Sequence, residues 1–406
     1  MPSQVLIGVA WFVGTIGVAY SAFGHPVNLG FAGAIAFGFL AACMNWRGLA
    51  LPVRLILPAL GLGMLAFVIP ALGQGFSFRT CSSAARGCLA LAWFTSILAL
   101  GGARARSALG WAAMALLIGN LILALSSPLL GGHFSAFEQV QHEYTAGLPR
   151  FRGLANTPAP AGVWALVSIG LLEAFPRSKL RWVSRALGLV EACATLSIAL
   201  LAVPALLAAL LPKRWLRWPC VACAVVFAAG VLYFQPLGVS VAGHALVNSR
   251  ELPQYWSGGL GPEFMPQVTF GAAGLSVTGH VTAYGKLALR GLTCFTEHAL
   301  VGVGPGRFRE ECRVMAMNTF GEWTDQRDSH NQLGGLLSEL GLAGVGLLAS
   351  AWVVGRRGYR FEVLNTWQRA VWVGLFVCSL GSEALLTLPV LALLASQLAP
   401  RIRTTA

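Results

Sequence analysis

The residues best placed to do chemistry lie near the end of the chain, where a polar segment leads into a long apolar run. His330 follows Ser329, a residue type that often caps the start of a helix, and a neutral imidazole there could act as a general base. A helix N-terminus also favours a nearby anion. From spacing alone, an interfacial histidine that merely helps to end a helix is the simpler interpretation.

Arginines are the second group of candidates. Arg150, Arg152 and Arg290 fall in loops that we place on the same side of a membrane as His330. A guanidinium group binds phosphate or diphosphate through two parallel hydrogen bonds, so an anion site is one interpretation, and pairing with acids is the other. A further cluster has close acidic neighbours, and we expect it to be paired and structural. That cluster is Arg307, Arg309 and Arg313.

A glycine-rich turn, residues 302–306 (GVGPG), precedes the polar segment. It has neither the GxxxxGK[ST] pattern nor the position of a nucleotide-binding loop, so we interpret it as a tight turn that redirects the chain. Gly334, Ser338 and Gly341 then recur at helical spacing, which predicts a stripe of small residues for close helix packing. Glu339 lies in the same helix and should face protein or a polar cavity.

Cysteine spacing predicts no metal site. The chain has nine cysteines, and Cys220 and Cys223 form a CxxC inside an apolar run without a second pair. Cys294 and Cys312 flank the glycine-rich turn, where a disulfide is possible but the sequence does not decide it.

Composition indicates a membrane protein. The 406 residues are 56% hydrophobic and 11% charged, with a mean hydropathy of +0.69, whereas soluble domains are about 25% charged. Apolar runs of nearly membrane-spanning length recur from end to end, which is typical of a multi-pass helical protein. The first run lacks a basic leading region and is followed at once by another, so we expect a first span and not a cleaved signal.

The apolar runs predict about twelve membrane spans, which would hold the candidate residues in the loops between them. The predicted spans are Val5–Phe23, Val27–Met44, Leu51–Leu72, Cys81–Leu100, Leu109–Leu130, Pro160–Phe175, Ala186–Ser197, Ile198–Leu211, Pro219–Phe234, Leu333–Val354, Ala370–Ser382 and Ala384–Leu398. Two long runs have Lys or Arg at both ends, which favours hairpins with both ends on the cytoplasmic side. Their tips would be residues 195–197 and 381–383.

With both termini cytoplasmic, the basic residues concentrate in the cytoplasmic loops. The net charge of +13 then reflects the positive-inside bias, and we expect no nucleic acid as a partner. Two long loops fall on the outer face, Gly131–Ala159 and Gly238–Gln332, and we expect Ser276–His298 in the second to be helical. The predicted organisation is spans in 1–237, a large loop in 238–332 and further spans in 333–406. Glu191 and Glu383 lie in or near apolar runs, but neither has a partner at matched depth for a proton relay.

At this point the chain resembles the O-antigen ligase and polymerase superfamily. The resemblance rests on residues 302–344: the GVGPG turn, a variable polar segment, His-Asn-Gln-Leu and a helix opening Ser-Glu-Leu-Gly-Leu-Ala-Gly. Residues 152–162, with RGL, NTP and a final glycine, are similar to the family's Arg-x-x-Gly…Asn-Pro…Gly pattern. Arg290 is similar to the arginine on the helix before the turn. These scattered blocks span about residues 150–347.

The resemblance implies an all-α integral membrane glycosyltransferase of the GT-C type, with one large, partly helical periplasmic loop in a bacterial inner membrane. The donor would be an undecaprenyl-diphosphate-linked glycan and the acceptor a sugar hydroxyl of lipid A–core. The reaction would use no metal or other cofactor and would invert the anomeric carbon. His330 would be the general base, and Arg290, Arg152 and Arg150 would hold the diphosphate. Supporting residues would be Asn331, Asp328, Gly304, Gly306 and Glu339.

One departure from the family's pattern matters. Relatives often have Ser-Arg at the tip of the middle hairpin, whereas this chain reads Leu196-Ser197-Ile198. If that arginine is essential in relatives, Arg150 or Arg79 takes its place, or this branch works differently.

Two alternative functions remain. A polymerase that joins lipid-linked repeat units shares the same catalytic region, and we favour the ligase because one histidine and few outer arginines suit a single diphosphate donor. A transporter or flippase predicts ionisable residues at mid-bilayer and repeats between halves. We find neither in the sequence, and the outer loop would be unexplained.

Overall fold

The structure is a computed structural model that describes most of the chain. The described residues are 2–15, 19–22, 25–28, 53–73, 77–100, 102–130, 136–137, 148–155, 157–173, 178–241, 244–248, 267–272, 275–312, 315–317, 323–325, 331–382 and 384–400, with single residues 33, 36, 40, 175 and 329. His330 and Asp328 lie outside them, as does most of the predicted span Val27–Met44.

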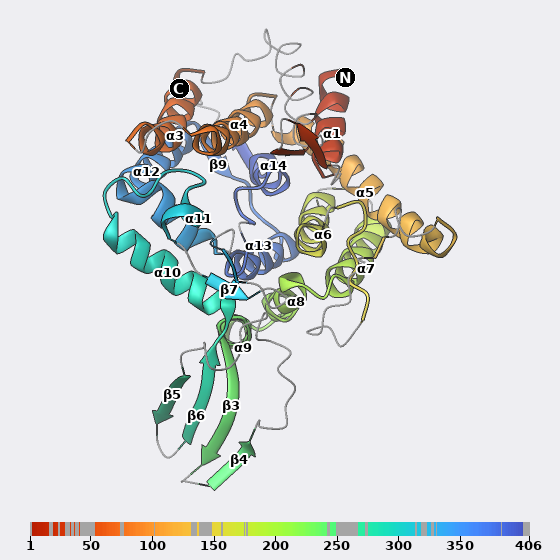
Figure 1. Cartoon of the computed structure of the whole chain (residues 1–406). Coiled ribbons are helices and arrows are strands. Elements are labelled where there is room, and N and C mark those ends of the chain that lie inside the picture. The colour runs from red at the N-terminus through yellow and green to blue at the C-terminus, as the bar shows by residue number, and fades with distance from the viewer. Residues whose placement is uncertain are drawn as a thin grey trace.

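Helices form the body of the molecule, drawn in Figure 1. They are α1 (Pro2–Thr15), α3 (Val53–Gly73), α4 (Phe78–Leu100), α5 (Gly102–Leu130), α6 (Pro158–Leu172), α7 (Ser178–Ala194), α8 (Ile198–Ala209), α9 (Arg214–Tyr233), α10 (Ala283–Glu297), α11 (Phe308–Glu311), α12 (Gln332–Gly358), α13 (Thr366–Ser379) and α14 (Leu388–Ser396). One large core of buried apolar residues joins helices from both halves of the chain.

Five of the described helices are long and apolar enough to cross a membrane, judged by length and composition. They are α3, α4, α5, α9 and α12, and α1, α6 and α8 are shorter apolar helices. The helical membrane class is therefore supported, but the count of twelve spans is not reached. The first predicted span is interrupted: α1 ends at Thr15, and β1 (Ala19–Ala22) pairs with β2 (His25–Asn28) where that span was expected to end.

The first predicted hairpin is present, since α7 packs against α8, whereas the helices of the second, α13 and α14, pack mainly against α8 and α4. α7 and α8 are joined at residues 195–197, where Ser197 caps α8 by accepting from the amide of Ala199. α13 and α14 are joined by the segment that follows Ser379 and precedes Leu388, although Glu383 lies outside the described residues. Each of the two apolar runs is thus divided into two helices at the position that the sequence predicted.

One end of the helical body carries the loops that were expected on the outer face. There Arg79 pairs with Glu310, Val303 bonds to Ser338, and Leu385 donates its amide to Gln332. We call residues 148–155, 157, 195–197, 298–312, 380–382 and 384–387 the loop end. At the opposite end of the helical body, ion pairs join Arg185 to Glu173 and Arg106 to Glu362, each at 2.6 Å.

The large loop contains a β-sheet that the sequence interpretation missed. β3 (Phe234–Val241), β4 (His244–Asn248), β5 (Gln267–Ala272) and β6 (Leu275–Val281) form an antiparallel sheet in the order β4-β3-β6-β5. The sheet projects from the helical body beside α9 (Figure 1). The expectation of a helix over Ser276–His298 is therefore wrong for its first part, which is strand β6, and right for α10. Short two-stranded pairs join β7 (Met315–Met317) to β8 (Trp323–Asp325) and β9 (Tyr359–Phe361) to β10 (Leu398–Pro400).

α12 is broken at Gly341, where φ is +62° and ψ is −173°. The glycine-rich turn fills the break with backbone hydrogen bonds. Val303 and Gly304 donate their amides to the carbonyls of Ser338 and Glu339 at 2.8 and 3.0 Å. In return, Leu342 and Ala343 donate to the carbonyls of Ala299 and Leu300. The turn therefore replaces helix hydrogen bonds that the break removes, which is more than the redirection of the chain that we expected.

Candidate functional site

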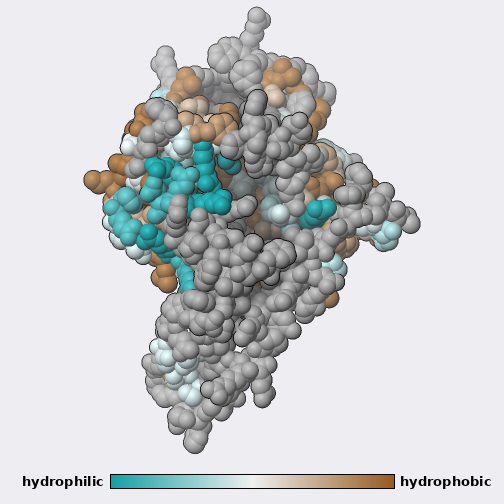
Figure 2. Space-filling model, viewed as in Figure 1, coloured by the Kyte–Doolittle hydropathy of each residue, from teal (hydrophilic) through white to brown (hydrophobic). Residues whose placement is uncertain are grey.

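A cavity of about 540 Å³ lies at the loop end of the helical body. Its walls come from α4, α6, α12 and the segment around α14, and residues 305–309 close one side. Figure 2 shows hydrophilic side chains gathered over α10 and α11, beside a hollow in the helical body. This cavity combines charged groups with apolar walls, so it is the candidate site.

Three arginines line the cavity. Arg79 and Arg86 lie on one face of α4 with Ser83 between them, at the spacing of successive helical turns. Arg309 enters from α11. Arg79 is 3.5 Å from Glu310, whereas neither Arg86 nor Arg309 has an ion pair or a hydrogen bond among the described residues.

The prediction that the cluster around Arg307 is paired and structural is confirmed for one of its members. Arg307 bonds to Glu311 and lies 3.5 Å from Glu310. It is wrong for Arg309, because the acids beside Arg309 in the sequence bond to other arginines. Arg313 lies outside the described residues.

Glycines of the turn bring the loop against α4. Gly306 has a φ of +73°, and a β-carbon there would collide with the Oγ of Ser83. Gly304 has a φ of +93°, which L-residues with a side chain rarely adopt. The two predicted supporting glycines therefore have a structural role, since they allow residues 305–309 to close the cavity.

Glu339 lines the cavity, as expected of an acid in this helix. It lies two residues before the break at Gly341, and its carbonyl accepts the amide of Gly304. The break and the turn thus fix the backbone that carries this carboxylate. The small-residue stripe is also confirmed: Gly334, Ser338 and Gly341 are buried, and α10 packs against Gly334 through Gly291.

Asn331 holds the start of α12 in place. Its side-chain oxygen accepts the amide of Gly334 at 2.8 Å, which makes Asn331 the N-cap instead of Ser329. Its side-chain nitrogen donates to the hydroxyl of Tyr233 at 2.7 Å and to the carbonyl of Leu380 at 3.2 Å. Asn331 therefore joins three helices, and it follows directly after His330 in the chain.

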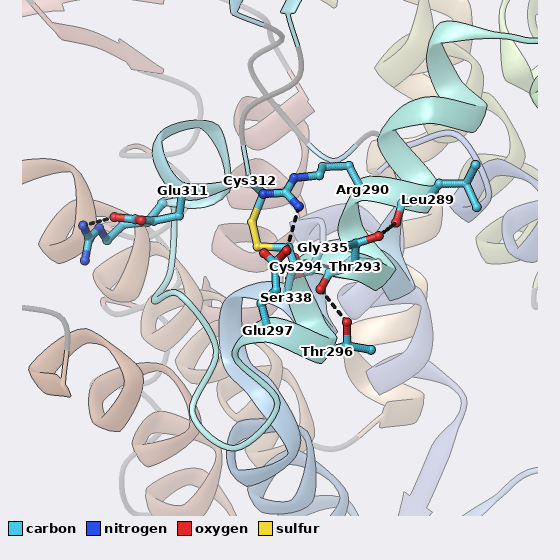
Figure 3. Close-up of a disulfide and its surroundings, with 12 residues drawn as sticks. Leu289, Arg290, Thr293, Cys294, Thr296, Glu297, Glu311, Cys312, Gly335 and Ser338 are labelled. Carbon is cyan, nitrogen blue, oxygen red and sulfur yellow. Dashed lines mark hydrogen bonds and ion pairs between the residues drawn. A yellow bond between two sulfur atoms is a disulfide. The ribbon is translucent and has the colours of Figure 1, made fainter. Parts of the chain in front are cut away.

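Arg290 lies on α10, outside the set of residues that line the cavity. Its guanidinium is 3.1 Å from Glu297, and its side chain is 30% exposed. Figure 3 shows Arg290 reaching past the disulfide between Cys294 and Cys312 toward Glu297. The disulfide that the sequence left open is formed, and it joins α10 to the end of α11.

Arg150 and Arg152 lie in a loop that is held against the α7–α8 tip. The Nε of Arg150 donates to the carbonyl of Thr195 at 3.4 Å, so the side chain of Arg150 reaches the tip between α7 and α8. The amide of Arg152 donates to the carbonyl of Ala136 at 2.8 Å. Desolvation raises the pKa of Tyr284 on α10, and the positive charge of Arg150 lowers it by less. Tyr284 therefore keeps its proton at neutral pH.

A buried polar link lies beneath this loop. Gly153 has a φ of +55°, and Leu154 donates its amide to the side-chain oxygen of Asn120 at 2.9 Å. The side-chain nitrogen of Asn120 donates to Glu191 at 2.9 Å. Glu191, which the sequence left without a partner, thus helps to hold the loop that carries Arg152.

Among the described residues, no group of three or more His, Cys, Asp or Glu side chains is placed to hold a metal ion. Comparison with protein-family models gives no match, and no curated protein matches the chain. The function is therefore inferred from the site itself.

Proposed function

We propose that this chain transfers O-antigen polysaccharide from undecaprenyl diphosphate to a sugar hydroxyl of lipid A–core on the periplasmic face of a bacterial inner membrane. The observation that supports this most is the cavity of about 540 Å³, which combines arginines with apolar walls where the predicted outer loops meet. A lipid-linked diphosphate donor needs both kinds of surface, because its head is anionic and its tail is a hydrocarbon.

In this proposal His330 acts as the general base. It accepts the proton of the acceptor hydroxyl while that oxygen attacks the anomeric carbon of the donor sugar. The bond between that carbon and the diphosphate oxygen breaks with inversion, and the diphosphate leaves with the bonding electron pair. Ser329 and Asn331, which flank His330 in the sequence, make hydrogen bonds at the start of α12, and His330 is placed there by the proposal.

Arginines stabilise the departing diphosphate in this proposal, because fixed guanidinium groups offset the charge that develops on the leaving group. Arg290, Arg152 and Arg150 are the candidates that the resemblance offers. The hydrogen bond of Arg150 to the hairpin tip supports its use where relatives have a tip arginine. The GT-C class, the full set of about twelve spans and cytoplasmic termini belong to the same proposal.

The test is complementation of a deletion strain, scored on a lipopolysaccharide gel. We expect deletion to leave bare core while lipid-linked polymer accumulates, and the wild-type gene to restore the polymer ladder. His330→Ala should fail to restore it at normal protein level. The matched control is His298→Ala, because His298 is exposed at the end of α10 and is not assigned to the site.

Each other outcome has a definite meaning. Full complementation by His330→Ala would rule out His330 as the general base. If the deletion strain makes lipid A–core with a single repeat unit, the chain is a polymerase. If the deletion strain loses lipid-linked material from the periplasm, the chain is a flippase.

A further inference from the structure

We infer that the cavity at the loop end continues into a second, apolar cavity, and that together they bind one lipid: a polyprenyl diphosphate with its head at Arg86 and Arg309. The inference rests on the proposed function for the identity of the lipid. It places the head at two arginines that line the cavity, which Arg290, Arg152 and Arg150 do not, and it adds a path for the hydrocarbon tail.

The two cavities are adjacent. The second has a volume of about 150 Å³ and lies between α3, α4, α12 and α14. Leu91, Leu348 and Leu391 line both cavities, so they form the neck between them. An occupant that fills both must therefore pass between three leucines.

Lining residues of the second cavity suit a hydrocarbon chain. They are mainly Ile, Leu, Ala, Phe and Trp side chains, with Thr95, Arg356 and Tyr359 as the polar exceptions. Along α4 the lining runs from Arg86 to Leu98, which is about 18 Å at the rise of an α-helix. That path is too long and too apolar for a head group alone.

The charges of the first cavity suit a diphosphate head. Arg86 and Arg309 have no acidic partner among the described residues, whereas Arg79 shares Glu310 with Arg307. Arg86 is exposed and Arg309 is half-buried, and both line the cavity, so an anion that enters it meets two cations. Both guanidinium groups line one cavity, and a diphosphate offers several oxygens to such N–H donors.

Glycines on α12 allow the tail path to be tested separately from the head. Gly355 lines the second cavity, and a β-carbon there would meet only Ala59 at 3.8 Å. A leucine at this position would project into the space assigned to the tail. Gly346 lies on the same helix with nothing within 4 Å of a β-carbon and lines neither cavity, so it is the matched control.

The experiment measures binding of radiolabelled undecaprenyl diphosphate to the full chain in detergent, with unlabelled farnesyl diphosphate and inorganic pyrophosphate as competitors. We expect the double variant Arg86→Gln/Arg309→Gln to weaken binding of the long-chain lipid at least tenfold, with Arg214→Gln unchanged. Arg214 is the matched control because it is exposed at the opposite end. Pyrophosphate should compete far more weakly than either lipid in the wild type.

Gly355→Leu should lower the affinity for undecaprenyl diphosphate at least fivefold and should leave the affinity for the shorter farnesyl diphosphate within twofold of the wild type. Gly346→Leu should change neither affinity. Wild-type affinity in the double arginine variant would overturn the head site. Equal loss of both lipids, or no loss, in Gly355→Leu would overturn the tail path. Binding that follows these expectations in a chain that fails the complementation test would sink the proposed transfer reaction and leave the lipid site intact.

Discussion

Arginines that lie side by side in the sequence have different partners in the fold. Arg307 and Arg309 are both next to acids, yet Arg307 takes both Glu310 and Glu311 while Arg309 faces the cavity. Arg307 caps the four-residue helix α11 and Arg309 lies within it, and residues two apart along a helix point to different sides. Spacing along the chain therefore could not identify Arg309 as a binding residue, and Arg86 was missed because it lies within an otherwise apolar run.

A substitution at Gly341 tests the close fit between α12 and the glycine-rich turn. A β-carbon at Gly341 would lie 2.5 Å from the amide nitrogen of Gly302, and its φ of +62° is unfavourable for any L side chain. We expect Gly341→Ala to lower the free energy of unfolding by at least about 2 kcal/mol. Thermal unfolding in detergent measures this. Gly346→Ala is the control and should keep or slightly raise stability, and an unchanged Gly341→Ala would contradict the close fit.

Between elements, the disulfide is the covalent link from α10 to α11. Its sulfurs are buried with Leu287, Val303 and Phe308 in a small core of their own. Cys294 and Cys312 are 18 residues apart, so the loop-closure model gives a stabilisation of about 3 kcal/mol. We expect Cys294→Ser/Cys312→Ser to lower the melting temperature, and Cys81→Ser, which removes an exposed free thiol, to leave it unchanged.

Alkylation followed by mass spectrometry gives a second measurement of the same prediction. Cys294 and Cys312 should react only after reduction, whereas Cys81 should react without it. Reaction of Cys294 in the unreduced protein would show that the bond is absent.

The helical elements could be predicted from sequence to a larger extent than the sheet. Long apolar runs located most of the described helices and the two breaks after α7 and α13, because each run is defined by its own residues. In strand β6 the apolar residues Leu275, Val277 and Val281 all fall on odd positions, so they lie on one face of the strand. This is the period-two pattern of a β-strand. It was overlooked because the amphipathic helix that follows was extended backward over it. Pairing of β6 with β5 is local, because only two residues separate these strands, whereas pairing of β6 with β3 joins residues distant in the sequence, which no local pattern specifies.

On the scale of the whole molecule, the two ends of the helical body should lie on opposite sides of the membrane. Leu300 is 73% exposed at the loop end, and Val363 is 93% exposed between α12 and α13 at the opposite end. In a chain without Cys81 and Cys223, we expect a membrane-impermeant maleimide to label Leu300→Cys in intact spheroplasts. Val363→Cys should be labelled only after the membrane is opened. Labelling of both, or of Val363→Cys alone, would reverse or refute the topology.

The site as a whole was less predictable than its parts. Sequence reasoning found the turn, Glu339 and the start of α12, all of which lie within one continuous block. It did not find that α4 and α6 complete the same cavity, since Arg86 and Trp164 are far from that block in the chain. Their convergence depends on how the helices pack, and packing is set by many weak contacts at once instead of by one motif.

The insertion of the glycine-rich turn into α12 has a consequence for biogenesis. Residues 299–304 are synthesised before Gly341, and the two segments share four backbone hydrogen bonds. In lipid an unbonded peptide group costs several kcal/mol, so a broken helix cannot be released into the bilayer alone. The turn must therefore already be folded back when α12 leaves the insertion machinery. Slow folding of the large loop would then delay the integration of every helix that follows.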